Sequence, residues 1–237
     1  MTIPALREFV LKQGSSRNVL NFDWTSIWAT NKKFIDPVAP RFTAVQKDQM
    51  VTAIVSDASS SPIVEQKPKH AKNGSIGAKT VVYSGDIFLD QEDAQTFQQD
   101  EEITLMNWGN AIVRGIQWDQ EHKLISRVDL ELHLAGDVKK TSKKITWLSK
   151  DQKLVPVELV DFGYMITKEK LEKEDDITQF INWNSEFRSY AWADCNVSGL
   201  REDDIIQLDR KGYYRVDRPF QDGKPAILFC IPTGKTG

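Results

Sequence analysis

The 237-residue sequence lacks the features that mark disulfide-rich proteins and membrane proteins. Its two cysteines, Cys195 and Cys230, belong to no spacing motif, so neither a disulfide framework nor a zinc site is expected. No apolar run approaches the roughly 20 residues that a membrane-spanning helix needs. The first residues also lack the charged-then-apolar layout of a signal peptide. We therefore expect a cytoplasmic protein without a membrane partner.

Catalytic motifs are missing as well. The histidines His70, His122 and His133 show no metal-ligand spacing, and we interpret each of them as a surface or strand residue. The sequence has no glycine-rich phosphate loop and no Gly-x-Ser-x-Gly elbow. Acid pairs such as Asp175-Asp176 lie in charge runs that are typical of a solvated face. We predict no catalytic residue and no metal site in this chain.

The formal net charge is −3, whereas nucleic-acid-binding proteins usually carry a basic excess. The charge is unevenly distributed, however. Acidic residues collect in 90–102 and 169–176, and basic residues collect in 67–72, 139–144 and 210–218. A protein that is acidic overall can still present one basic face to phosphate, so this composition leaves an RNA ligand open.

The chain changes character at 31–45, a stretch that contains Pro37 and Pro40. Before it, apolar spacing predicts a helix over 2–13 and a second helix that begins after the capping residue Asp23. The two prolines disfavour helix in the residues before them and end this helical part.

After residue 43, short strands alternate with turns about every ten residues, as in antiparallel barrels or sandwiches. One later helix is predicted over the acidic stretch 167–180. The predicted strands are 79–83, 86–90, 103–108, 111–118, 124–134, 143–148, 154–162, 204–208, 212–217 and 226–231.

Two segments carry residues suited to binding RNA. Asn107-Trp108-Gly109-Asn110 combines an aromatic ring with amides, which suits a stacked base; equally, Trp108 can plug the end of a barrel, and we favour that structural interpretation. In the second segment, a bend near Gly212 would bring Gln207 and Arg210 to one site. Amide and guanidinium groups together hydrogen-bond base edges, and Arg also pairs with phosphate.

A third segment is similar to an ATP-binding loop. Lys140-Thr141-Ser142-Lys143-Lys144 resembles the Lys-Met-Ser-Lys-Ser loop of class I aminoacyl-tRNA synthetases. It runs into a strand-like segment, 145–148, and no His-Ile-Gly-His-like partner accompanies it. We therefore favour a basic hairpin over a nucleotide site.

Several segments taken in order resemble eukaryotic cytosolic glutamyl-tRNA synthetases, and the resemblance extends over essentially the whole chain. Glutaminyl-tRNA synthetases share the architecture, but they usually have His-Trp-Val where this chain has Thr-Trp-Leu. The glutamyl family is therefore preferred, and the corresponding region of a glutaminyl enzyme is the alternative. The matching segments are 13–17, 31–41 (Asn-Lys-Lys-Phe-Ile-Asp-Pro-Val-Ala-Pro-Arg), 107–110, 139–148 and 204–214.

The resemblance implies a C-terminal fragment: a mainly β fold with two antiparallel β-barrels that bind the anticodon, preceded by a helical junction. The junction would span 1–40. The barrel nearer the catalytic half would take 41–100 plus about 185–237, and the distal barrel, with one helix, would take about 101–184. ATP and Mg²⁺ would act in an N-terminal catalytic half, and this chain would hold no cofactor.

The resemblance also assigns residues to the interface with tRNA-Glu. Arg41, Gln207, Arg210 and Asn73 match anticodon-contacting positions, although the Gln-x-Lys-Arg segment of glutaminyl enzymes has no counterpart near 95–100. Partners would be tRNA-Glu and the catalytic half, with any multi-synthetase assembly engaging regions outside this chain, and DNA is not expected. Lysines would contact phosphates: Lys32, Lys33, Lys69, Lys72, Lys139, Lys140, Lys143 and Lys144.

Two other function classes stay open on the residues alone. One is a non-catalytic β module that binds protein or glycan through its seven tryptophans. The other is a small hydrolase that uses a pair of carboxylates. A basic face that gathers Arg41, Gln207 and Arg210 would argue against both.

Overall fold

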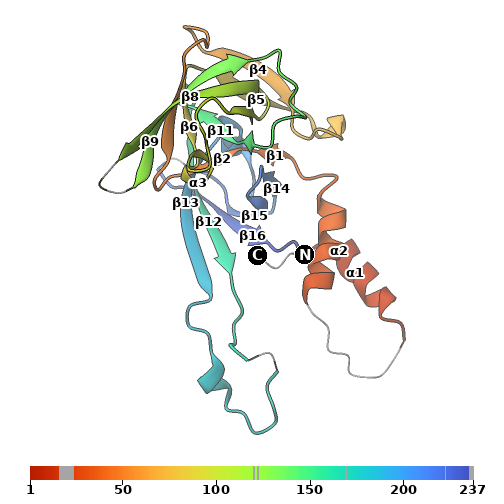
Figure 1. The fold of residues 1–237 in the computed structure, drawn as a ribbon. Coiled ribbons are helices and arrows are strands. Elements are labelled where there is room, and N and C mark those ends of the chain that lie inside the picture. Colours follow the sequence, from red (N-terminus) through yellow and green to blue (C-terminus); the bar gives the residue numbers. More distant parts are fainter. Residues whose placement is uncertain (16–23, 120, 122, 169, 222, 235–237) are drawn as a thin grey trace.

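The computed structural model describes residues 1–237 except 16–23, 120, 122, 169, 222 and 235–237. A pair of N-terminal helices is followed by two curled β-sheets (Figure 1). This confirms the predicted fold class, mainly β with two barrel-like sheets after a short helical segment, although the sheets are mixed rather than purely antiparallel. Among the described residues, no helix is long and apolar enough to cross a membrane. The predicted cap Asp23 and His122 fall outside the described residues.

The N-terminal helices, α1 (Ile3–Lys12) and α2 (Trp24–Ile35), pack against each other. Thr2 caps α1. The buried Asn31 of α2 accepts hydrogen bonds from the Thr2 backbone N–H at 2.8 Å and from the Thr2 hydroxyl at 3.2 Å. Helix α2 ends two residues before Pro37, where the sequence predicted the end of the helical part.

We expect an Asn31→Ala variant to loosen α1, because both hydrogen bonds from Thr2 lose their acceptor. The free energy of unfolding should fall by about 1–2 kcal/mol, the usual cost of leaving partly buried donors unpaired. Urea unfolding gives the stability, and hydrogen exchange of the α1 amides gives the location of the change. Lys32→Ala in the same helix is the control and should lose less than about 0.5 kcal/mol; equal losses in the two variants would refute the role of Asn31.

Sheet A is nearly closed because the same stretch of chain forms both of its edges. Its strand order is β1-β14-β15-β16-β12-β13-β2, and the edge strands β1 and β2 are separated only by Thr43. The buried Asp194 binds this residue: its carboxylate accepts from the Thr43 N–H at 2.7 Å, and its own N–H donates to the Thr43 carbonyl at 3.0 Å. The strands of sheet A are β1 (Arg41–Phe42), β2 (Ala44–Gln46), β12 (Val155–Phe162), β13 (Glu186–Ala193), β14 (Ile205–Leu208), β15 (Gly212–Arg218) and β16 (Ala226–Ile231).

Sheet B closes in the same way. Its order is β10-β7-β8-β9-β3-β6-β11, and the edge strands β10 and β11 are separated only by the buried Thr146. The predicted single strand over 143–148 is therefore two strands that pair on opposite edges. The strands of sheet B are β3 (Val51–Val55), β6 (Asp86–Leu89), β7 (Glu102–Leu105), β8 (Gly109–Asp119), β9 (Leu124–His133), β10 (Lys144–Ile145) and β11 (Trp147–Ser149).

Both sheets contain parallel as well as antiparallel pairs. In sheet A, β1 pairs with β14 and β12 pairs with β16 in parallel; in sheet B, β10 pairs with β7 and β3 pairs with β9 in parallel. Spacing along the sequence predicts hairpin neighbours, which are antiparallel. The parallel pairs join segments that are remote in sequence, so the spacing gave no sign of them.

The strand pairing divides the chain differently from the predicted domain ranges. Strands β3 and β6 come from 41–100 but pair in sheet B, and β12 comes from 101–184 but pairs in sheet A. Sheet A does take strands from both the start and the end of the β region. The domain ranges stay a prediction.

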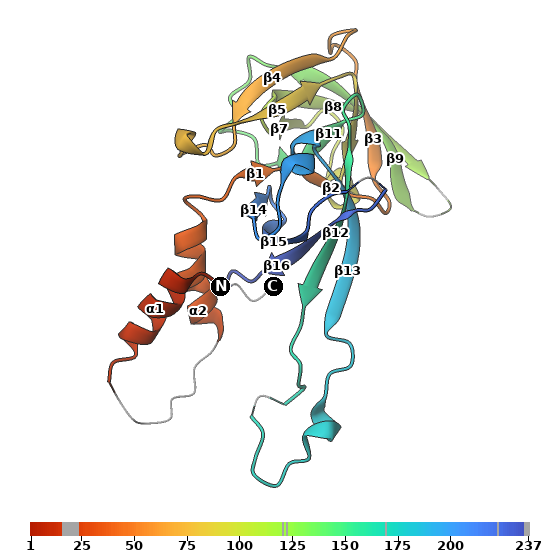
Figure 2. The same cartoon turned by 180° about the vertical axis from the view of Figure 1, so that it is seen from behind.

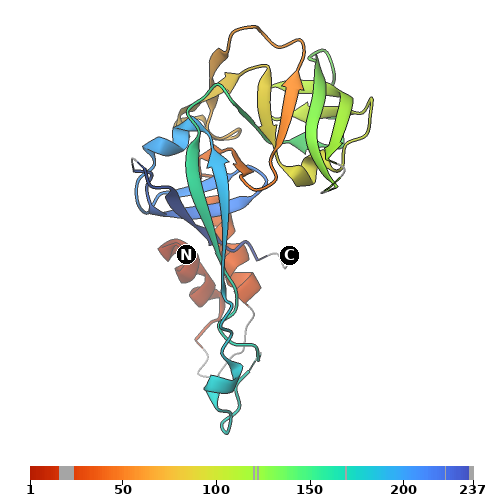
Figure 3. The same cartoon turned by 90° about the vertical axis from the view of Figure 1, so that its left-hand side faces the viewer.

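Two hairpins extend beyond the sheets (Figures 2 and 3). Strands β4 (Ile63–Pro68) and β5 (Ala78–Tyr83) form a separate two-stranded sheet. The loop between them, residues 69–77, contains the short helix η1 (Gly74–Ile76) and lies close to β1 (Figure 2); we call it the corner loop. Strands β12 and β13 continue as a long ribbon toward the same end of the molecule as α1 and α2 (Figure 3).

The predicted helix over 167–180 is wrong. In the described part of this segment, only the 3₁₀ helix η2 (Ile177–Phe180) is helical. The Asp175 carboxylate accepts from the Glu172 N–H at 2.6 Å, and the Asp176 carboxylate accepts from the Thr178 N–H at 3.0 Å. Such local bonds to the backbone compete with helix formation, which explains why an acidic stretch of helical composition folds as turns.

Candidate nucleic-acid interface

The structure places Arg41 and Gln207 side by side. They are register partners in the parallel pair β1–β14, and the Gln207 N–H donates to the Pro40 carbonyl at 2.9 Å. The two residues are held together by the strand pairing that closes sheet A. We call them the reading pair.

The reading pair contains polar atoms that the fold leaves unpaired. Arg41 Nε, a donor, and Gln207 Oε1, an acceptor, are buried and have no hydrogen-bond partner among the described residues. Buried side-chain polar atoms are almost always paired in native proteins, and exceptions often mark functional sites. The Arg41 side chain is 29% exposed, so a ligand can reach its guanidinium group.

Asp36 links the corner between α2 and β1 to the reading pair. Its carboxylate accepts from the Tyr213 hydroxyl of β15 and lies 3.6 Å from Arg41 Nη2. Burial raises the pKa of Tyr213, and the Asp36 carboxylate raises it further, so the phenol stays protonated and donates the hydrogen bond. The apolar contacts beneath the corner come from Ile35, Ala39, Tyr213 and Ile231.

The corner loop is tied to the same corner by hydrogen bonds. The Lys69 carbonyl accepts a hydrogen bond from the Arg41 N–H at 2.8 Å, and Asn73 Nδ2 donates to the Pro37 carbonyl at 2.9 Å. His70 Nδ1 accepts from the Lys72 N–H, so Nε2 carries the proton and donates to the Asp36 carbonyl at 3.0 Å. The structure thus brings Lys69, Lys72 and Asn73 next to Arg41 and Gln207.

One interpretation for this loop is wrong. His70 is 3% exposed and belongs to a loop, so the interpretation as a surface or strand residue is wrong. Both polar atoms of the Asn73 side chain have partners, because its oxygen also accepts from the Ser75 N–H and hydroxyl. Asn73 therefore holds the loop in place, and its contact with a base stays a prediction.

Arg210 points to a different element. It has φ +64° in the turn between β14 and β15, and its guanidinium forms a bidentate ion pair with Asp93 of the short helix α3 (Gln91–Ala94). Lys211 Nζ lies 2.8 Å from Asp90, the residue before that helix. Asp93 raises the pKa of Arg210, which keeps the group charged. The predicted meeting of Gln207 and Arg210 is therefore not seen in these contacts.

The predicted phosphate-binding lysines fall in separate places. Lys32 and Lys33 lie in the last turn of α2. Lys33 lies on the side of α1, because its positive charge helps to lower the pKa of Glu8 in that helix. Lys143 Nζ lies 2.6 Å from Glu101, and Lys144 Nζ donates to the Thr141 carbonyl at 2.7 Å, so both have internal partners. Lys139 and Lys140 are exposed in the loop before β10.

The segment 140–144, which resembles an ATP-binding loop, does not form the predicted basic hairpin. Strand β10, which follows it, pairs in parallel with β7 rather than with β9. Trp108 packs on the core of sheet B, with its ring centroid 4.7 Å from Trp147 and 5.2 Å from Tyr83. This supports the structural interpretation, in which Trp108 plugs the barrel.

Several residues at the corner were missed from the sequence. Asp36 stands in the Ile-Asp-Pro segment and Tyr213 in Gly-Tyr-Tyr, so motif position could have indicated both. Asp209 and Lys79 form a buried ion pair behind the reading pair, with Nζ 3.6 Å from Oδ2. Nothing local distinguishes Lys79 from the other lysines of the chain.

Two family models match the chain, and both describe the anticodon-binding domain of class I tRNA synthetases for glutamate and glutamine. One matches residues 39–133 and the other residues 144–217, so together they span most of the β region. The chain belongs to this family of anticodon-binding domains. Membership favours tRNA binding over the protein- or glycan-binding module and over the hydrolase.

Curated relatives match the chain from end to end. It is 51% identical over 236 residues to a probable cytoplasmic glutamate–tRNA ligase of Schizosaccharomyces pombe, covering 100% of this chain and 33% of that protein. It is 46% identical to the cytoplasmic glutamate–tRNA ligase of Saccharomyces cerevisiae, with 32% of that protein covered. A bifunctional glutamate/proline–tRNA ligase of Mus musculus is 38% identical, with 16% covered. The chain thus spans about a third or less of these proteins.

Proposed function

We propose that this chain is the anticodon-reading part of a cytoplasmic glutamate–tRNA ligase and that Arg41 and Gln207 read an anticodon base. The observation that carries the proposal is the pair of unpartnered buried atoms, one donor and one acceptor, on register partners of adjacent strands. A base edge offers donors and acceptors side by side, so it can satisfy both once the two side chains turn toward it.

In this proposal the lysines provide affinity without sequence preference. Lys69 and Lys72 stand beside the reading pair, and Lys139 and Lys140 are exposed on sheet B. Phosphate contacts of this kind make binding depend on salt but not on base identity. Arg210 would join the interface after leaving Asp93, and Asn73 after leaving Pro37 and Ser75.

The chemistry of the whole ligase would lie outside this chain. We propose that a catalytic part, which uses ATP and Mg²⁺ to attach glutamate to tRNA-Glu, precedes the described helices in the full protein. The names of the matching relatives support glutamate over the alternative, glutamine. Any assembly with other synthetases would use regions beyond this chain.

A binding measurement with the 237-residue chain tests the proposal. Affinities for a tRNA-Glu transcript and for the same transcript with a substituted anticodon are compared by filter binding or anisotropy at several salt concentrations. We expect a preference of roughly tenfold or more for the native anticodon, with similar salt slopes for both transcripts. Equal affinities at every salt concentration would refute anticodon reading.

Asp93→Ala should raise the affinity of the chain for tRNA-Glu. The substitution removes a negative charge and frees the Arg210 guanidinium from its bidentate partner. We expect a gain of about threefold to tenfold at low salt and a steeper salt dependence, since one more cation faces the RNA. Glu92→Ala, which removes the same charge from the same helix but leaves the ion pair, is the matched control; an equal gain there would mean that net charge alone is responsible.

A further inference from the structure

Lys79 is a buried cation directly behind the reading pair. It lies on β5 with a side chain only 4% exposed, and its ammonium group is 3.6 Å from Oδ2 of Asp209, which is 8% exposed. Among the ion pairs between described residues, this is the one in which both side chains are less than a tenth exposed. Asp209 follows β14, two residues after Gln207, and its N–H donates to the Phe42 carbonyl at 2.8 Å.

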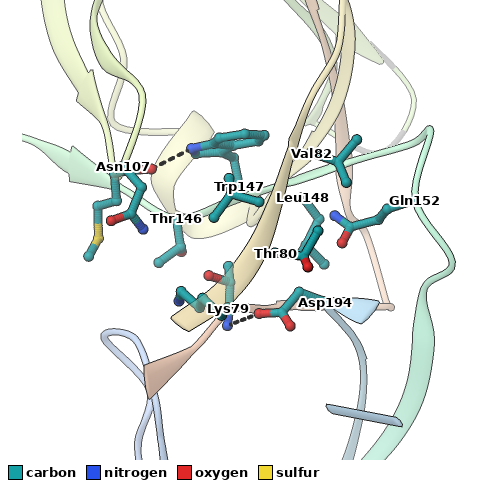
Figure 4. A pocket seen from close by; sticks show the side chains of 12 residues that line it. Lys79, Thr80, Val82, Asn107, Thr146, Trp147, Leu148, Gln152 and Asp194 are labelled. Atoms are coloured by element: carbon teal, nitrogen blue, oxygen red, sulfur yellow. Dashed lines mark hydrogen bonds between the residues drawn. The ribbon is translucent and has the colours of Figure 1, made fainter. Parts of the chain in front are cut away.

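A second buried carboxylate, that of Asp194, also interacts electrostatically with Lys79. Asp194 lies with Lys79 at one end of a small cavity between sheets A and B (Figure 4), and the lysine favours its ionised form. Burial raises the pKa of both Asp194 and Asp209, and the positive charge of Lys79 opposes that rise in each case. For Asp209, Arg41 opposes the rise as well.

The two carboxylates differ in what else they can bind. Asp194 has its own hydrogen-bond donors: the Thr43 N–H at 2.7 Å and the Asn196 N–H at 3.0 Å. Asp209 is in electrostatic reach of Arg41, the guanidinium of the reading pair. A buried carboxylate strongly favours a nearby cation, so Asp209 without Lys79 would attract Arg41.

We propose that Lys79 is a positioning residue for anticodon reading: by neutralising Asp209, it keeps the Arg41 guanidinium available to a base. The inference rests on the proposed function. It goes beyond that function by giving a role to a residue whose side chain is buried. Lys79 also belongs to the strand that carries the corner loop, and the neighbouring Thr80 is fixed by Asn196 at 2.8 and 2.9 Å, so its position is well defined.

The test compares two double variants of the 237-residue chain. Lys79→Met alone should cost roughly fivefold or more of the preference for tRNA-Glu over the anticodon-substituted transcript, with the salt slope unchanged. Lys79→Met with Asp209→Asn removes the carboxylate that competes for Arg41, and the preference should return to within about twofold of the wild type. Lys79→Met with Asp194→Asn restores the same net charge but leaves Asp209, and the preference should stay low.

Urea unfolding of each variant separates folding from recognition. If Lys79→Met is unfolded, the two double variants still decide the matter, since each lacks one buried carboxylate. A wild-type preference that survives in Lys79→Met, or that returns equally in both double variants, would overturn the role of Lys79 and leave the proposed function intact. A wild-type chain without any preference would instead refute the proposed function itself.

Discussion

An Arg41→Ala variant should lose most of the preference for the native anticodon. Loss of a bidentate contact to a base costs about 1–3 kcal/mol of discrimination, which corresponds to roughly 5- to 150-fold in relative affinity. The side chain is partly exposed and its Nε has no partner among the described residues, so this donor is not already used within the protein. Affinity for the anticodon-substituted transcript should change little.

Two further variants show whether the loss belongs to base reading. Arg41→Lys keeps the positive charge but lacks the forked donors of guanidinium, so it should also lose discrimination while keeping the salt dependence. Arg215→Ala removes an arginine of the same sheet that is paired with Asp203 and Asp217, and it should behave like the wild type. If Arg41→Lys retained full discrimination, Arg41 would act as a phosphate contact.

Asp194→Ala should produce the largest loss of stability among single substitutions at the junction of the sheets. It leaves the Thr43 N–H without its acceptor at the point where the chain passes from one edge of sheet A to the other. It also removes a counter-charge from Lys79. Leaving a buried donor without its acceptor typically costs about 1–3 kcal/mol, and we expect a decrease of about that size in the free energy of unfolding.

Urea unfolding of Asp194→Asn provides the comparison. The amide keeps an oxygen that can accept from the Thr43 N–H, so this variant should lose clearly less than Asp194→Ala. A decrease below about 1 kcal/mol for Asp194→Ala would mean that the strand break at Thr43 is held by other contacts.

The sequence indicated the features of the fold that depend on local patterns. The two prolines placed the end of α2, and the strand predicted over 212–217 is β15. The helix predicted over 167–180 failed for an equally local reason, since aspartates there bond to the backbone. Composition alone does not reveal that competition.

The parts of the site that escaped prediction depend on contacts between remote residues. The Asp93 carboxylate that binds Arg210 is 117 positions away in the chain, and the Asn196 side chain that fixes Thr80 is 116 positions away. Lys79 looks like a surface lysine until Asp194 and Asp209 are brought to it. The resemblance to a known family indicated Arg41 and Gln207 as candidate site residues. It gave no information about the residues that hold them in place.

Thr43 and Thr146 each separate the two edge strands of one sheet, and this arrangement determines the order in which the sheets can fold during synthesis. Thr43 and its partner Asp194 are 151 positions apart, so the seam of sheet A closes only after the strands of sheet B have been synthesised. Closing so long a loop carries an entropic cost and is slow compared with forming hairpins. On the ribosome, sheet B can therefore assemble first. The reading pair forms late, so a chain truncated before β14 would leave Arg41 without Gln207. If the proposed function holds, an incomplete translation product could not compete for tRNA through this pair.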